Sequence, residues 1–198
     1  MKRTLAFSFR KKAMRNISFL ALLLCGLLRS AWAGASPHTY RKTLVQPAEI
    51  QDYPCAKGYA WFFDNGRLNR CTVTREIRFG EVRIPAGSYI ALNPDGKPDL
   101  VQMSHDAPIL GLTCQGGSLL GPGEGAVVAF YPSGKLKLCF LAHAQTVQGV
   151  PCAKDGFFAT LTGVDPGVSF DESGKLSACK LSKDFGPLRR GDRFVQAP

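Results

Sequence analysis

The stretches FYPSGKLKLC (residues 130–139) and FDESGKLSAC (residues 170–179) share an aromatic residue, a short polar turn, Gly-Lys-Leu and a cysteine five residues after the glycine. FDNGRLNRC (residues 63–71) keeps this order with Arg in place of Lys, and LNPDGK (residues 92–97) keeps the turn alone. Recurrence of one pattern along a chain is the sequence sign of a repeated structural unit. The chain is therefore predicted to form the same element four times.

Each stretch has the composition of a β-hairpin. Apolar and aromatic residues come before the turn, as in Tyr59–Phe63, and a short alternating run follows it. The two residues before each glycine suit a type I turn, and the glycine suits the left-handed position of a bulged loop, where a side chain would clash. The predicted fold is all-β: an antiparallel β-hairpin repeat array of about four hairpins. A weaker recurrence between the hairpins is a short apolar step that ends on Gly80, Gly111 or Gly149.

The side chains after each turn should alternate between the two faces of the strand. Each cysteine then shares a face with the aliphatic residue two positions on, which predicts inward-facing cysteines. The leucine after each Gly-basic pair has the opposite parity, so it either packs at the hairpin end or is re-aimed by the bulge. These leucines are Leu68, Leu136 and Leu176. The copy at Gly96 has no cysteine, and Pro98 and Asp99 are expected to disturb its second strand.

The cysteines predict three disulfides. Six of them follow residue 33, namely Cys55, Cys71, Cys114, Cys139, Cys152 and Cys179. An even count in an exported chain indicates disulfides and an oxidising compartment, and makes metal ligation the weaker interpretation. Three units read cysteine, strand, turn, strand, cysteine, so the predicted pairs are Cys55–Cys71, Cys114–Cys139 and Cys152–Cys179, each clasping one hairpin. Each crosslink should contribute about 3 kcal/mol by restricting the unfolded chain.

Residues 1–33 have the three parts of a secretory signal peptide. A basic region precedes the apolar run Ile17–Leu28, and Ala31-Trp32-Ala33 forms a small-x-small cleavage site. We expect cleavage after Ala33 and a periplasmic or secreted protein. Two starts fit this leader: Met1, and Met14, from which a compact signal also runs. Residues 34–50 are expected to be a flexible N-terminal segment, and residues 51–198 a single β-repeat domain.

The basic charge of the chain belongs mostly to the leader. The net charge is +10, but seven of the 25 basic residues and none of the 15 acidic ones lie in residues 1–33, which leaves 18 against 15, or +3. Such a balance is not that of a nucleic-acid-binding surface. The apolar run of the leader is too short for a spanning helix, which needs roughly 20 residues, so no transmembrane span is expected in the mature form.

Two groups of residues are candidates for binding. Tyr59, Trp61 and Phe62 stand in one aromatic cluster that would supply both faces of a strand, so it is either buried between two layers or exposed as a platform for a glycan or partner protein. Arg189 and Arg190 belong to a solvated turn or contact anionic envelope components.

The sequence predicts no catalytic, metal or cofactor site. The motifs Gly-x-Ser-x-Gly, His-Glu-x-x-His and Cys-x-x-Cys are absent. His105 and Asp106 are adjacent, so on a strand they would point to opposite faces and could not form a relay. His143 is expected to be structural. An envelope hydrolase whose polar residues meet only in three dimensions, and an inhibitor of a secreted hydrolase, remain open alternatives.

The pattern Phe-x-x-x-Gly-Lys-Leu-x-x-Cys in residues 130–139 and 170–179 resembles, in its aromatic, polar turn and Gly-Lys-Leu, the hairpin of MORN-variant repeats of bacterial proteins. This resemblance covers about a dozen residues in each of three or four windows. It implies binding or scaffolding and no catalytic residues. The expected function is therefore that of an exported bacterial, non-enzymatic binding or scaffold protein whose partner is a protein or an envelope glycan.

Overall fold

The computed structural model describes residues 38–117, 126–154 and 167–196. The predicted signal peptide and its cleavage site after Ala33 lie outside these residues. Within them all regular structure is β-strand and all pairing is antiparallel, which confirms the predicted fold class.

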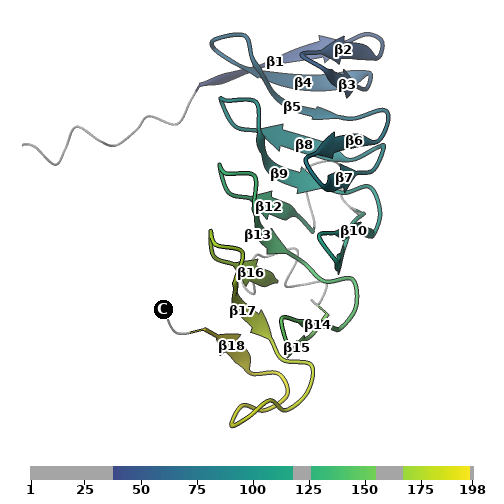
Figure 1. The fold of residues 1–198 in the computed structure, drawn as a ribbon. Coiled ribbons are helices and arrows are strands. Elements are labelled where there is room, and N and C mark those ends of the chain that lie inside the picture. Colours follow the sequence, from purple (N-terminus) through teal and green to yellow (C-terminus); the bar gives the residue numbers. More distant parts are fainter. Residues whose placement is uncertain (1–37, 118–125, 155–166, 197–198) are drawn as a thin grey trace, which may run out of the picture. The chain divides into compact units, whose positions relative to one another are not determined.

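One large sheet contains ten strands (Figure 1). In their order across the sheet they are β1 (Thr39–Leu44), β4 (Gly58–Phe63), β5 (Leu68–Thr72), β8 (Tyr89–Leu92), β9 (Pro98–Gln102), β12 (Val128–Phe130), β13 (Leu136–Cys139), β16 (Val168–Phe170), β17 (Leu176–Lys180) and β18 (Arg193–Val195). The pairs β4–β5, β8–β9, β12–β13 and β16–β17 are the four predicted hairpins, which we call the long hairpins.

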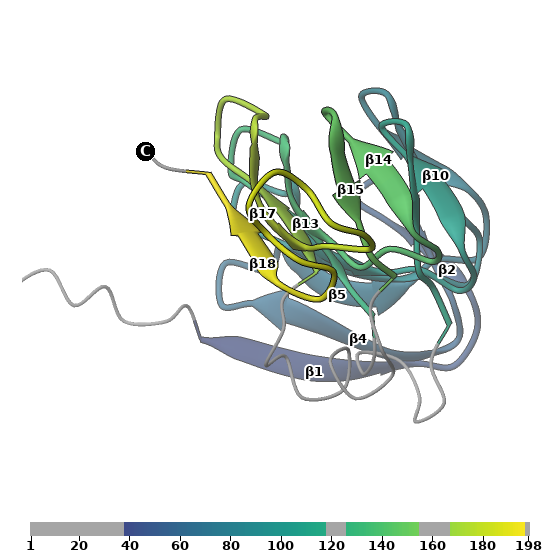
Figure 2. The same ribbon diagram turned by 90° about the horizontal axis from the view of Figure 1, so that it is seen from below.

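Four short hairpins lie in a row against one face of this sheet (Figure 2). They pair β2 (Ala48–Ile50) with β3 (Tyr53–Cys55), β6 (Ile77–Phe79) with β7 (Val82–Ile84), β10 (Ala107–Ile109) with β11 (Leu112–Cys114), and β14 (Gln145–Val147) with β15 (Val150–Cys152). Their tips explain the weaker recurrence in the sequence. Leu110 and Gly111 both have positive φ, at 48° and 83°, as a two-residue type I′ turn requires.

Each short hairpin and the long hairpin after it form one unit. We call the units A (residues 48–72), B (77–102), C (107–139) and D (145–180). The core lies between the two layers, because fully buried side chains come from both of them, for example Ile84 and Ile109 from short hairpins and Ile90 and Val128 from long ones.

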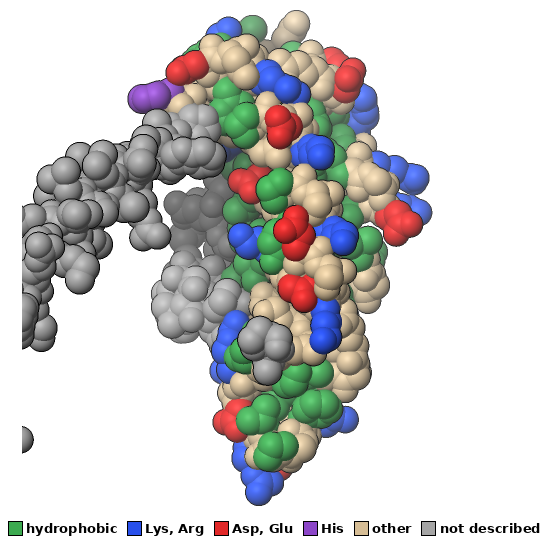
Figure 3. Space-filling model, turned by 60° about the vertical axis from the view of Figure 1, so that its left-hand side comes forward, with side chains coloured by type: hydrophobic (Ala, Val, Ile, Leu, Met, Phe, Trp, Pro, Cys, Tyr) green, Lys and Arg blue, Asp and Glu red, His purple; other side chains and the backbone are tan. Residues whose placement is uncertain are grey.

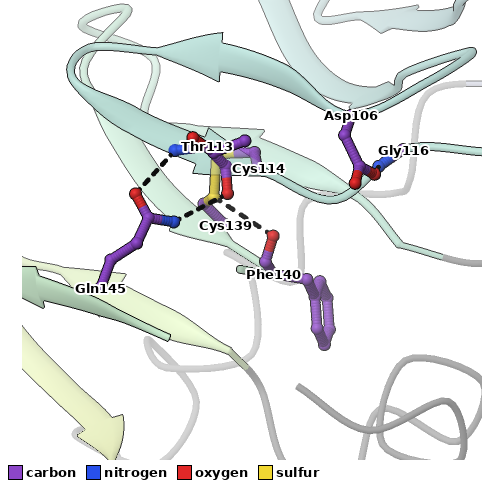
Figure 4. Close-up of a disulfide and its surroundings, with 7 residues drawn as sticks. All are labelled: Asp106, Thr113, Cys114, Gly116, Cys139, Phe140 and Gln145. Atoms are coloured by element: carbon purple, nitrogen blue, oxygen red, sulfur yellow. Dashed lines mark hydrogen bonds between the residues drawn. A yellow bond between two sulfur atoms is a disulfide. The ribbon is translucent and has the colours of Figure 1, made fainter. Parts of the chain in front are cut away.

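The structure pairs the cysteines as predicted, and it shows what the disulfides join. Cys55–Cys71, Cys114–Cys139 and Cys152–Cys179 have Cα atoms 5.7, 5.8 and 5.7 Å apart. In each pair one cysteine ends a short hairpin and the other lies in the second strand of the long hairpin. Every disulfide therefore connects the two layers and does not clasp a single hairpin as expected; Figure 4 shows this for Cys114–Cys139. Ile84 and Val101 hold the corresponding positions in unit B and are both 0% exposed. Two apolar side chains therefore fill the place of a disulfide there.

The long-hairpin turns have the predicted geometry. Gly66, Gly96, Gly134 and Gly174 have φ between 78° and 90°. A β-bulge after each turn decides on which face the leucine lies. In unit A, Phe62 pairs with Leu68 and the preceding Trp61 pairs with Arg70, so Asn69 has no partner in the opposite strand. This bulge puts Leu68 on the same face as Cys71 in spite of the odd spacing, and Leu68 is 1% exposed.

Two expectations were wrong. Residues 39–50 are not a flexible segment, because β1 pairs along its whole length with β4 and β2 pairs with β3. The hairpin at Gly96 is not degenerate either, since β9 pairs with both β8 and β12. Pro98 is tolerated because it is the first residue of its strand, where a missing N–H is least costly. Asp99 takes the bulge position that Asn69 holds in unit A.

Candidate binding sites

The aromatic cluster of β4 is divided between the two faces of the sheet. Phe62 packs in the core between the layers and is 7% exposed, so the prediction that it binds a partner is wrong. Tyr59 and Trp61 lie on the opposite, outer face. Tyr59 is 53% exposed and Trp61 is partly exposed. Alternation along the strand therefore separates one expected site into a core residue and two surface residues.

Neighbouring strands add three more side chains beside Tyr59 and Trp61. The register places Arg41 of β1 and Arg70 of β5 directly across from Trp61, one on each side. Residues opposite each other in an antiparallel pair share a face. The Arg41 guanidinium carbon lies 4.3 Å from the centroid of the Tyr59 ring, and Tyr89 of β8 meets Trp61 edge-on with 6.1 Å between ring centroids. We call these five residues the aromatic–arginine patch.

The patch has an ordered geometry. The rings of Tyr59 and Trp61 are also 6.1 Å apart, with their planes at 67°. Edge-on pairs of this kind are favourable, and the cation above the Tyr59 ring adds an attraction to the ring electrons. The Arg70 Nε donates to the Asn69 Oδ1 at 3.1 Å, which orients that guanidinium. Two rings with exposed surface, Tyr59 and Trp61, therefore stand between two cations on the outer face of β1, β4 and β5, and the Tyr89 ring that supports Trp61 is itself 9% exposed.

The other predicted binding residues, Arg189 and Arg190, lie in the connection from β17 to β18, at the opposite end of the sheet order from β4. Arg189 forms an ion pair with Asp184 at 2.9 Å, and the Arg190 amide donates to the same carboxylate. The Arg190 amide and the Arg189 side chain together hold the pKa of Asp184 below its ordinary value. The Arg189 side chain and the Arg190 amide thus help to close a turn, Arg190 itself is exposed, and neither residue lies near the aromatic–arginine patch.

Ser104 and Asp106 are hydrogen-bonded to backbone groups, and His105 lies beside the Ser104 hydroxyl. The Ser104 Oγ donates to the Ala86 carbonyl at 2.7 Å, and it lies 3.0 Å from the His105 Nδ1. The Asp106 carboxylate accepts the Gly116 amide at 2.9 Å (Figure 4). His143 is exposed. Within the described ranges, no group of three His, Cys, Asp or Glu side chains could hold a metal ion.

The tips of the two layers meet along the edge formed by the long-hairpin turns, and a glutamine holds them together in two units. In unit D the Gln148 side chain donates to the Gly174 carbonyl and accepts the Leu176 amide, both at 2.9 Å. In unit A Gln51 does the same with Gly66 and Leu68, at 3.1 and 2.9 Å. We call this arrangement the glutamine latch. In unit B, Gly80 stands where the other two units have the glutamine, and Pro98 stands where they have the leucine. Proline has no N–H, so no backbone amide needs an acceptor at this position in unit B.

Unit C breaks this pattern. Its tip residue at the latch position is Leu110, which can neither donate nor accept, and which is 50% exposed. Beside it lies a pocket of about 310 Å³ between units C and D. Its lining is mostly apolar, with Leu110, Leu112, Leu136, Val147 and Phe170, and is completed by Lys135, Thr146, Gln148 and Gly174.

The corresponding groove between units A and B is different in character. It has a volume of about 480 Å³ and contains three arginines, Arg67, Arg75 and Arg78. The face of the molecule that Figure 3 shows carries acidic, basic and hydrophobic side chains in turn along its length. The units therefore share their core and differ at their tips.

Sequence reasoning missed most of these features. Arg41 was assigned to a flexible segment, and Tyr89 and Arg70 join Trp61 only through strand pairing. The signal that could have found Tyr89 is the alternation of β8, in which Ile90 and Leu92 face the core. The difference between Leu110 and the two glutamines, Gln51 and Gln148, could also have been found by aligning the units in the sequence, because each of the three residues stands at the tip of a short hairpin.

No protein-family model, curated protein or solved structure matches the chain. In the described part of the chain, no helix is long and apolar enough to cross a membrane. The three disulfides are consistent with an oxidising compartment outside the cytoplasm.

Proposed function

We propose that this chain is an exported, non-enzymatic binding protein that holds a partner protein against the aromatic–arginine patch. The observation that carries the proposal is the placement of Trp61 between Arg41 and Arg70, with Tyr59 and Tyr89 packed against its ring. Trp, Tyr and Arg are the residues most enriched among those that dominate the energy of protein–protein interfaces.

The charge of the patch indicates the kind of surface that it fits. Arg41 and Arg70 are both exposed and give the patch two positive charges. Complementary charge speeds encounter and selects partners, so the expected contact surface on the partner is acidic with an apolar centre. An envelope glycan is the second candidate, because the half-exposed Tyr59 ring also offers a flat apolar face to a sugar.

Other observations support an exported scaffold. Crosslinks between the layers make the sheet a rigid support, and a rigid support lowers the entropy that binding costs. The leader motif in residues 1–33 supports export by a signal peptide cleaved after Ala33, to the periplasm or beyond the cell. The resemblance of the Gly-Lys-Leu hairpins to MORN-variant repeats supports the same class of function.

The test uses the mature chain from Gly34. Trp32 and Trp61 are the two tryptophans of the sequence, so Trp61 is the only one in this chain and its fluorescence reports on the patch. Proteins captured from envelope extract by the wild-type chain should be lost with Tyr59→Ala/Trp61→Ala, and the purified partner should shift the Trp61 emission. Tyr40→Ala is the matched control, because Tyr40 of β1 stacks on Phe62 on the opposite face of the sheet from Tyr59 and Trp61. This variant should capture the same proteins as the wild type.

Equal capture by the double variant and the wild type would exclude the patch as the binding surface. Capture that survives protease treatment of the extract but is lost after glycosidase treatment would select the glycan in place of the protein.

The 3.0 Å contact between the Ser104 Oγ and the His105 Nδ1 favours a second candidate, an envelope hydrolase. Its geometry is unfavourable for a nucleophile, because the Ser104 hydroxyl proton is donated to the Ala86 carbonyl. The variant His105→Ala/Asp106→Ala/His143→Ala tests this candidate. Loss of a hydrolytic activity from a folded variant would establish the enzyme and overturn the binding protein. Inhibition of a secreted hydrolase by the wild-type chain would instead make that hydrolase the partner.

A further inference from the structure

Unit C departs from its neighbours at two positions that meet at the same pocket. The first is the latch position. Gln51 and Gln148 accept the amides of Leu68 and Leu176, whereas Leu110 leaves the corresponding Leu136 amide without a glutamine oxygen. Leu136 also lies outside the register that joins β13 to β16, which begins at Leu138.

The second position is the basic residue that follows the turn glycine. In unit A the Arg67 guanidinium donates to the Asp95 carbonyl at 2.8 Å, and in unit B the Lys97 ammonium donates to the Pro132 carbonyl at 3.4 Å. Both side chains thus bind the turn of the next unit. Among the described residues, Lys135 of unit C forms neither such a bond nor an ion pair, and it lines the pocket.

We propose that the pocket between units C and D binds a small free carboxylic acid with an apolar body, such as a medium-chain fatty acid. The apolar body packs on Leu110, Leu112 and Phe170. One carboxylate oxygen accepts the Leu136 amide where the other units use a glutamine oxygen, and the Lys135 ammonium neutralises the charge. The volume of about 310 Å³ is at the lower end of the range for small-molecule sites, which suits a ligand of this size.

The chain itself supplies the variant that tests this site. Leu110→Gln installs the side chain that units A and D carry, and it adds no backbone strain, because Gln51 and Gln148 stand at φ 51° and 49° and Leu110 at 48°. The new glutamine should take the Leu136 amide and remove the apolar wall. Octanoate binding to the mature chain, measured by titration calorimetry, should weaken at least about tenfold, since an apolar contact of leucine size is lost. The melting temperature should stay equal or rise.

Lys135→Gln tests the charge. Octanoate binding should weaken about threefold, as for a partly exposed ion pair, while binding of octan-1-ol should not change. Lys97→Gln is the matched control in unit B and should leave octanoate binding unaltered. Tyr59→Ala/Trp61→Ala should also leave it unaltered, because the pocket does not depend on the aromatic–arginine patch.

Three results would overturn the proposal. They are the absence of saturable octanoate binding to the wild-type chain, equal binding by Leu110→Gln, and equal weakening by Lys97→Gln and Lys135→Gln. Tighter binding of a peptide that ends in leucine than of octanoate would likewise overturn the assignment to a free acid.

Discussion

Removing the disulfide of unit D should show how much of the stability comes from joining the two layers. Cys152 and Cys179 are 27 residues apart in the sequence, and Cys55 and Cys71 are 16 apart. The chain-entropy relation gives about 3.6 kcal/mol for the longer loop and about 3.1 kcal/mol for the shorter one. Cys152 and Cys179 are 0% and 1% exposed, so replacing both with alanine also loses packing of the two sulfurs. The expected total loss is about 4 to 5 kcal/mol.

Unit B provides the comparison that separates the crosslink from the packing. Ile84 and Val101 fill the cysteine positions there, so Cys152→Ile/Cys179→Val should recover part of the packing but none of the crosslink. Its loss should be smaller than that of the alanine pair. The measurement is equilibrium unfolding in urea, followed by circular dichroism and by the fluorescence of Trp61. The denaturant slope should increase in both variants, because an uncrosslinked unfolded chain exposes more surface.

A loss below about 1 kcal/mol for the alanine pair would refute this account of the disulfide, since the loop entropy alone exceeds that value. The three crosslinks together account for about 10 kcal/mol, comparable with the whole stability of an ordinary domain. The fully reduced chain should therefore be unfolded or close to its midpoint at 37 °C.

Three further predictions concern the tips of the hairpins. Gln148→Leu removes both 2.9 Å bonds of the latch and should cost about 1 to 2 kcal/mol in urea unfolding, while Gln46→Leu, at an exposed position before β2, should be nearly neutral. Gly134 has a φ of 84°, so Gly134→Ala should lower the free energy of unfolding by about 1 kcal/mol or more. The control Ser133→Ala, at an exposed position of the same turn, should lower it by less than about 0.5 kcal/mol, and equal effects would contradict the assigned turn. The Ser173 hydroxyl and the Lys175 amide lower the pKa of the Asp171 carboxyl in the folded protein below its ordinary value of 3.8. The ionised carboxylate therefore contributes its full stabilisation of the folded state above pH 3.8, and this contribution is lost as the pH falls through the lower pKa of the folded protein. Asp171→Asn keeps the acceptor that Asn93 provides in unit B, and urea unfolding between pH 5 and pH 2 should show a smaller loss of stability in this variant than in the wild type.

The long hairpins and the disulfides could be predicted because their signals are local. A glycine at positive φ, two turn-forming residues before it and an apolar run on each side specify a bulged hairpin over about ten residues. The order of cysteines within each unit was then enough to select the three pairs. Pro98 was misjudged because the cost of a proline in a strand depends on whether its amide is used, and only the register shows that Pro98 begins β9.

The candidate sites could not be predicted in the same way. Trp61 and Tyr59 were found by their composition, but Arg41, Arg70 and Tyr89 join them through pairing between strands that are distant along the chain. The pocket depends on Leu110 and Lys135, which are 25 residues apart and belong to different layers.

The sequence by itself therefore determined the hairpins, their turns and the cysteine pairs, because short-range backbone preferences and the order of residues within a unit are sufficient for these. Only the tertiary structure decided that the short hairpins form a second layer, that the disulfides connect the layers, and that Phe62 is core while Trp61 is surface. These features depend on which face of each strand is buried and on the registers between strands, and both follow from the packing of the whole domain.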